Sequence, residues 1–193
     1  MLWTGRTVPP EDPRYAAAAA RQGLDLALVL AIVEHESSFR PGAVKREPNY
    51  RYVLDVSTWK PFRRLTDAEA ASPSPPADFP APPGVTRDAE WTLQRMSFGL
   101  LQCMGALARE RNYTARWLDD LIADVEAQLD IGCAHLAAKV AKYRPIEAAI
   151  SAFNAGSPRV LTDAAGRTVY ANQVYVDAVL PLVAKYRARI AES

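Results

Sequence analysis

Residues 24–39 read LDLALVLAIVEHESSF, and this stretch decides the fold of the core. Its residues from Leu24 to Val33 are almost wholly apolar, and Asp25 is a residue type that commonly caps the start of a helix. We therefore predict a buried helix from about Leu26 to Glu36, which ends before the Phe-Arg-Pro-Gly segment that follows. The apolar run is too short to cross a bilayer, so we expect no integral membrane segment.

Glu36 stands at the end of this apolar helix, where a carboxylate is costly to bury without a partner. Val29, Ile32 and Val33 precede it by seven, four and three positions and therefore share its helix face. Apolar surroundings disfavour the charged form and would raise the pKa of the carboxyl, which suits a proton donor. The simpler interpretation is an exposed helix end, and for Glu36 taken alone we favour it.

The composition indicates an ordinary globular protein. The 193 residues suit a single domain over 1–193, and 49% hydrophobic with 23% charged residues allow a substantial core. The net charge is +1 and no basic block is present, so we expect no nucleic-acid partner. The opening residues MLWTGRTVPP show no signal-peptide pattern. We expect a monomer.

The cysteines and histidines do not form a recognisable ligand pattern. Cys103 and Cys133 lie outside any CxxC spacing, so we expect two buried thiols in helices, with a disulfide between them left open. His35 and His135 have no ligand-spaced partners in the sequence. We therefore expect neither a metal nor another cofactor.

Helical patterns dominate the chain, so we predict a mainly α fold. The predicted helices span about 15–22, 26–36, 89–95, 99 or 101–110, 118–143, 145–153 and 172–190, the last with a kink at Pro181. Residues 45–90 read as an insertion with at most a small β element near Tyr50–Val56. Within the insertion, Ser72–Gly84 contains six prolines, which forbid a helix and favour an exposed, extended loop.

Two short motifs follow the insertion. Ser97-Phe-Gly-Leu-Leu-Gln102 places a glycine and an amide at the start of a predicted helix, where the amide could orient a substrate or an acid. Phe153-Asn-Ala-Gly156 closes another predicted helix, and Asn154 could hydrogen-bond a sugar hydroxyl or an acetamido group. Each motif is weak alone, since an ordinary helix start and an ordinary helix end explain them equally well.

Taken in order, the motifs resemble those of the lysozyme-like lytic transglycosylases of the soluble lytic transglycosylase type. ESSF, SFGLLQ, FNAG and Tyr175-Val176 stand where that family has ESxF, GLMQ, AYNAG and a late YV. The resemblance covers about Leu24–Tyr186, apart from the Pro-rich insertion. It implies a single, mainly α domain of the goose-type lysozyme and lytic transglycosylase fold, with its core at about 24–186.

The resemblance also implies a role for each matching residue. Glu36 matches the catalytic acid/base of the family. Phe153 stands in place of the family's tyrosine and lacks its hydroxyl, so aromatic packing is the role that the match supports there. The residues that match substrate-binding or groove-lining positions are Ser97, Gln102, Phe153, Asn154 and Tyr175.

The implied reaction cuts the β-1,4 bond between N-acetylmuramic acid and N-acetylglucosamine in peptidoglycan strands and leaves a 1,6-anhydro end. One alternative is a lysozyme-like hydrolase with a second carboxylate, for which Asp55 and Glu47 are available. Another is a non-catalytic cell-wall-binding or virion structural protein, which the Phe153 substitution supports and Glu36 argues against. Family members without a leader are often phage-encoded, so we expect a phage source, or another export route, for an enzyme of the cell wall.

Overall fold

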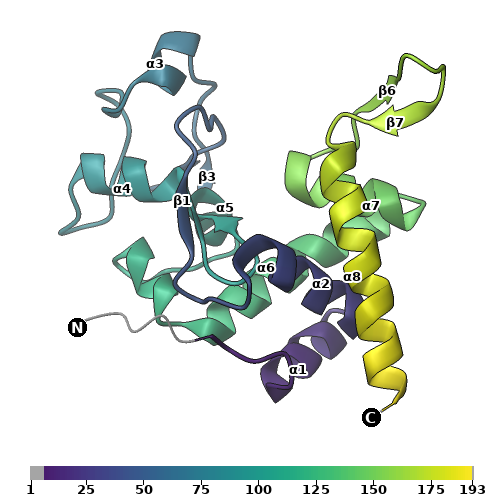
Figure 1. Cartoon of the computed structure of the whole chain (residues 1–193). Coiled ribbons are helices and arrows are strands. Elements are labelled where there is room, and N and C mark those ends of the chain that lie inside the picture. Colours follow the sequence, from purple (N-terminus) through teal and green to yellow (C-terminus); the bar gives the residue numbers. More distant parts are fainter. Residues whose placement is uncertain (1–6, 193) are drawn as a thin grey trace. The chain divides into compact units, whose positions relative to one another are not determined.

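The computed structural model describes residues 7–192, and its internal contacts divide the chain into two compact units (Figure 1). Among the described residues, unit 1 comprises Thr7 and Arg40–Ile131, and unit 2 comprises Val8–Phe39 and residues 132–192. Residues 1–6, which make up most of the opening segment without a signal-peptide pattern, lie outside the described residues. The assignment of residues 1–193 to one domain stays a prediction.

Unit 2 is built from helices, with one small hairpin. Helix α2 is buried on every side between Ala27 and Val33 and packs mainly against α8 and α1. Its apolar sequence thus has a direct structural cause, because no face of the helix meets water along this stretch. The elements are α1 (Pro13–Arg21), α2 (Leu26–Ser37), the later part of α6 (Val125–Lys142), α7 (Ile146–Ala155), β6 (Val160–Thr162), β7 (Thr168–Tyr170) and α8 (Gln173–Ala191).

Local sequence sets both ends of α2. At its start, the Asp25 side chain accepts a hydrogen bond of 2.9 Å from the Ala27 backbone N–H, which is the predicted N-cap. At its end, Ser38 and Phe39 both adopt left-handed backbone conformations, with φ of 51° and 62°. Such φ values are uncommon outside glycine, and the Phe39 ring compensates by packing edge-on against Tyr15 and Tyr186. This anchored turn fixes the last residues of the helix.

Unit 1 combines short strands and short helices. Its three-stranded antiparallel sheet has the order β1-β4-β5, with Lys45 opposite Ser97 and Ser97 opposite Met104. The strands are β1 (Val44–Arg46), β2 (Leu54–Asp55), β3 (Lys60–Pro61), β4 (Met96–Phe98) and β5 (Cys103–Met104). The helices are α3 (Asp67–Ala71), α4 (Arg87–Gln94), α5 (Gly105–Glu110), the 3₁₀ helix η1 (Leu118–Ile122) and the start of α6.

The Pro-rich segment contributes to the core of unit 1. It is free of helix, as predicted, but Phe79 within it is only 1% exposed and packs edge-on against Trp91 and Phe62. Immediately before it, α3 is a helix that the sequence reading missed. A capping box marks its start, because Thr66 and Glu69 exchange side-chain-to-backbone hydrogen bonds.

The mainly α fold with small strands is confirmed, and two of the predicted helices need correction. The helix predicted from Gly99 or Leu101 begins only at Gly105, because residues 99–102 form the turn between β4 and β5. The helix predicted over 118–143 is interrupted between η1 and α6. Strands also occur beyond the Tyr50–Val56 region, in the β4–β5 and β6–β7 hairpins.

Two further predictions concern thiols and membrane segments. Cys103 and Cys133 are both buried thiols, but only Cys133 lies in a helix, since Cys103 belongs to β5. Within residues 7–192 no single helix has the length and apolarity to cross a membrane. Helices α1 and α2 together meet that test by length and composition alone, as a pair bent by 118°.

Candidate active site

Glu36 and Tyr175 meet inside unit 2. Glu36 lies in the last turn of α2 and Tyr175 in the first turn of α8, and both are half-buried. The Tyr175 hydroxyl donates a hydrogen bond of 2.6 Å to Glu36 Oε1. A carboxyl that is partly shielded from water and held by a neutral donor has a defined orientation, as a residue that handles protons requires. The two residues are therefore in contact, although 139 positions separate them in the sequence.

The neighbours of Glu36 on α2 have different surroundings. The His35 ring stands edge-on to the Tyr175 ring, with centroids 4.8 Å apart. Glu34 turns away, and its carboxylate accepts hydrogen bonds from Lys185 and from the Tyr186 hydroxyl. Burial raises the pKa of Glu34, but these hydrogen bonds outweigh it, so that the pKa lies below its usual value. Glu34 is thus a structural anion, and Glu36 alone of the two faces Tyr175.

Asn154 lies beside the start of α8. It is exposed near the end of α7, and its Oδ1 accepts a hydrogen bond of 2.9 Å from Asn172 Nδ2. Asn172 precedes α8 directly and also bonds Ser151 of α7. Sequence reasoning missed Asn172 and Ser151, although an asparagine just before a helix is a familiar capping signal.

Phe153 occupies the interior of unit 2. It is 9% exposed, and its ring tilts against that of His135 with centroids 5.5 Å apart. The phenyl ring therefore packs where a tyrosine hydroxyl would need a polar partner. A substrate-binding role for Phe153 stays a prediction.

Ser97 and Gln102 meet within unit 1. The Ser97 hydroxyl donates a hydrogen bond of 2.9 Å to Gln102 Oε1, and Gln102 Nε2 donates to the carbonyl oxygens of Ala43 and Gly99. The Gln102 amide thus ties the β4–β5 turn to the residue that precedes β1. These bonds use both ends of the amide, so its clearest role is to shape this turn.

Gln128 is a third residue whose role the sequence did not indicate. Its buried side chain accepts a hydrogen bond of 2.9 Å from the Leu100 backbone and donates to the carbonyl oxygens of Pro41 and Leu121. Gly99, with φ of 72°, lies directly against this side chain, and a Cβ at that position would overlap the Gln128 amide. The glycine of the GLLQ motif is thus required for close approach as well as for positive φ.

The two carboxylates considered for a hydrolase both belong to unit 1. Asp55 Oδ1 accepts hydrogen bonds from Ser57 and Thr58 in the β2–β3 turn. Burial raises the pKa of Asp55, but the bonds from Ser57 and Thr58 have the larger combined effect and hold that pKa below its usual value. Glu47 forms an ion pair of 2.6 Å with Lys45. Each carboxylate therefore has a local structural partner.

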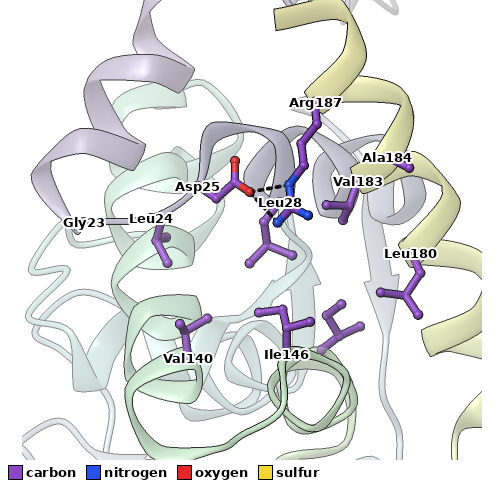
Figure 2. A pocket seen from close by; sticks show the side chains of 11 residues that line it. Gly23, Leu24, Asp25, Leu28, Val140, Ile146, Leu180, Val183, Ala184 and Arg187 are labelled. Carbon is purple, nitrogen blue, oxygen red and sulfur yellow. Dashed lines mark hydrogen bonds and ion pairs between the residues drawn. The ribbon is translucent and has the colours of Figure 1, made fainter. Parts of the chain in front are cut away.

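A small apolar pocket of about 180 Å³ lies elsewhere in unit 2, between the start of α2 and the middle of α8 (Figure 2). Leu24, Leu28 and Leu180 contribute to its lining, and the ion pair between Asp25 and Arg187 crosses its rim. Glu36 and Tyr175 do not line it. Among residues 7–192, no three His, Cys, Asp or Glu side chains gather as metal ligands would.

Comparison with known families matches residues 14–175 to the model described as the transglycosylase SLT domain. The matched segment contains Glu36, Asn154 and Tyr175 together with the β4–β5 turn. No curated protein and no solved structure gives a match to the chain.

Proposed function

The chain belongs to the transglycosylase SLT domain family, and we propose that it is a peptidoglycan lytic transglycosylase with Glu36 as its single acid/base. Family membership supports transglycosylase activity on peptidoglycan in general. The finer proposal is cleavage of the β-1,4 bond between N-acetylmuramic acid and N-acetylglucosamine, with a 1,6-anhydro end as product. The place of action is then the cell wall, and a phage source stays a prediction.

The proposed chemistry uses one carboxyl twice. Protonated Glu36 gives its proton to the glycosidic oxygen, the bond from that oxygen to C1 breaks, and the N-acetylglucosamine side leaves as an alcohol. The Glu36 carboxylate then takes the proton of the C6 hydroxyl of the muramoyl residue. The C6 oxygen attacks C1 and closes the anhydro ring. Glu36 ends protonated, as it began, and no water is consumed.

The contact between Glu36 and Tyr175 is the observation that carries the proposal. A neutral tyrosine hydroxyl donates to Oε1, so the acidic proton of the carboxyl is favoured on Oε2. The same hydrogen bond serves the carboxylate after proton transfer. One donor therefore keeps the group oriented in both of the states that the reaction requires.

The hydrolase alternative needs a second carboxylate to activate water. Asp55 is engaged by the turn that it caps, and Glu47 is paired with Lys45. These partners support the scheme in which Glu36 works alone. The non-catalytic alternative is supported only by the Phe153 substitution, and the contact between Glu36 and Tyr175 argues against it.

Tyr175→Phe should lower kcat roughly ten- to a hundredfold with little change in KM. The substitution removes one hydrogen bond to an ionisable group, which is worth about 1.5–3 kcal/mol, and leaves the ring in place. Turbidity loss of purified sacculi over a range of substrate concentrations measures both constants. Tyr143→Phe is the matched control, because the Tyr143 hydroxyl bonds no described residue. Equal activity of the two variants would remove Tyr175 from the proposed machinery.

Mass spectrometry of the released muropeptides tests the reaction itself. The proposal predicts fragments that end in anhydro-muramoyl residues, since the C6 oxygen and not water closes on C1. Reducing muramoyl ends would identify a hydrolase and overturn the single-carboxyl scheme. A Glu36→Gln sample treated in parallel controls for contaminating wall enzymes.

A further inference from the structure

Asn172 has a side-chain orientation that its neighbours determine. Its Nδ2 lies 3.1 Å from the backbone carbonyl oxygen of Ser151, which can only accept a hydrogen bond. Nitrogen, rather than oxygen, must therefore face that carbonyl. The Ser151 hydroxyl completes the arrangement by donating a bond of 2.6 Å to Asn172 Oδ1. The amide of Asn172 is thus held at both ends by one residue of α7.

This orientation determines the polarity of Asn154, that is, which end of its side-chain amide faces Asn172 and which end faces outward. The second N–H of Asn172 Nδ2 points to the Asn154 side chain, at 2.9 Å, so the Asn154 atom that faces it must be the acceptor Oδ1. The Asn154 NH₂ group is then directed away from Asn172, and Asn154 is exposed. Asn154 consequently offers hydrogen-bond donors to its surroundings.

Asn172 also belongs to the start of the helix that carries Tyr175. Its backbone carbonyl accepts hydrogen bonds from the N–H groups of Tyr175 and Val176, at 2.9 and 3.4 Å. Tyr175 in turn donates to Glu36. Asn172 therefore bonds both to the end of α7 and to the first turn of α8, which contains Tyr175, the residue that orients the proposed acid. All of these contacts lie within unit 2.

We propose that Asn172 is a positioning residue that presents the Asn154 amide as a hydrogen-bond donor to a carbonyl or hydroxyl oxygen of the glycan. The inference rests on the proposed function, because it takes the substrate to be an N-acetylated glycan strand. Asn172 does not touch that substrate. It acts through Asn154, whose outward group it selects.

Asn172→Asp is the most informative change. An aspartate keeps the size of the side chain and suits a position before a helix N-terminus, but it loses the N–H that bonds the Ser151 carbonyl. The melting temperature of the variant therefore checks that the fold is retained. It cannot donate, so Asn154 turns its own N–H toward the carboxylate and presents Oδ1 outward instead. We expect KM on sacculi to rise roughly tenfold, the effect of one lost hydrogen bond to the substrate, with a smaller change in kcat.

Three companion variants separate positioning from general damage. Asn154→Asp leaves an acceptor for Asn172 and also reverses the outward group, so it should raise KM as Asn172→Asp does. Ser151→Ala leaves both Nδ2 bonds of Asn172 intact and should change KM less than threefold, as roughly half a kcal/mol allows. Asn49→Asp, at an exposed position of unit 1, is the charge control and should change nothing.

Side-chain amide exchange measured by NMR gives a readout that needs no substrate. In the intact protein the Asn172 NH₂ protons should exchange slowly and those of Asn154 fast, and Asn172→Asp should protect one Asn154 proton. Fast exchange at Asn172, or an unchanged KM in Asn172→Asp, would overturn the positioning role. If the exchange pattern appears but the intact protein leaves sacculi undigested, the proposed function fails and the polarity of Asn154 stands.

Discussion

Glu36→Gln should lower the proposed peptidoglycan-clearing rate of this chain roughly 10²–10⁴-fold, the range for a general acid/base. The loss should lie toward the upper end, because the same group is proposed to give a proton and later to take one. Glutamine has nearly the same size and still offers an amide oxygen to the Tyr175 hydroxyl. Turbidity loss of purified sacculi measures the rate, and the melting temperature checks that the fold is retained.

Glu34→Gln is the matched control for this variant. It lies two positions earlier on α2, has the same chemistry, and is bound by Lys185 and Tyr186 instead of Tyr175. We expect clearing to be unaffected. Because the folded pKa of Glu34 is lowered, its carboxylate stabilises the fold above its ordinary pKa, and this contribution disappears as the pH falls through the lowered value. Clearing by Glu36→Gln equal to that of Glu34→Gln would contradict the assignment of the acid.

Arg109→Met should be the most destabilising change in unit 1. Arg109 is 1% exposed and binds the fully buried Glu90 through two hydrogen bonds of 2.9 and 3.0 Å. It also donates to the carbonyl oxygens of Tyr113 and Ala115. Removing the guanidinium leaves a buried carboxylate without its cation, which costs about 3–5 kcal/mol. Urea unfolding followed by circular dichroism measures the loss in free energy of unfolding.

Two further variants test whether the loss of stability arises because the Arg109–Glu90 ion pair is buried. Arg63→Met removes an arginine that also binds two carboxylates, Glu69 and Asp78, but on the surface, and its effect should be small. Adding Glu90→Gln to Arg109→Met should recover part of the loss, because the unpaired charge is then gone. Equal destabilisation by Arg63→Met and Arg109→Met would refute the explanation.

Much of unit 2 could be predicted from the sequence because its signals are local. The apolar run after Asp25 gave α2 to within one residue, and the capping bond at Asp25 is the one expected. The helix predicted over 172–190 corresponds to α8, which starts at Gln173 and ends at Ala191. In each case periodicity and a cap residue lie within the segment that they determine.

The β4–β5 turn could not be predicted in the same way. Gly99 and Gln102 both have positive φ, and the turn is held by Gln128, which follows Gly99 by twenty-nine positions. A window of neighbouring residues contains no sign of that contact, so the apolar pair Leu100-Leu101 read as a helix start. The burial of Phe79 could not be predicted for a similar reason. Its core partner Trp91 lies beyond the prolines that favoured an exposed loop.

The candidate site likewise combines features that local sequence predicts with contacts that it does not. Taken alone, the position of Glu36 indicated an ordinary helix end. The order of the motifs along the chain is the reason why Glu36 is proposed as the acid. The contact with Tyr175 joins residues 139 positions apart, so no local rule predicts it. The sequence did not indicate Asn172, because its proposed role depends on which side-chain atom faces Asn154. The neighbouring residues in the folded chain determine that orientation.

The most direct measurement is a digestion of sacculi in water enriched in heavy oxygen, with the glycan ends analysed by mass spectrometry. If Glu36 closes the anhydro ring without water, the new muramoyl ends are anhydro forms that carry no heavy oxygen. New reducing ends that carry heavy oxygen would show that water attacks C1, and would contradict the proposal that one carboxyl performs the reaction as a lyase.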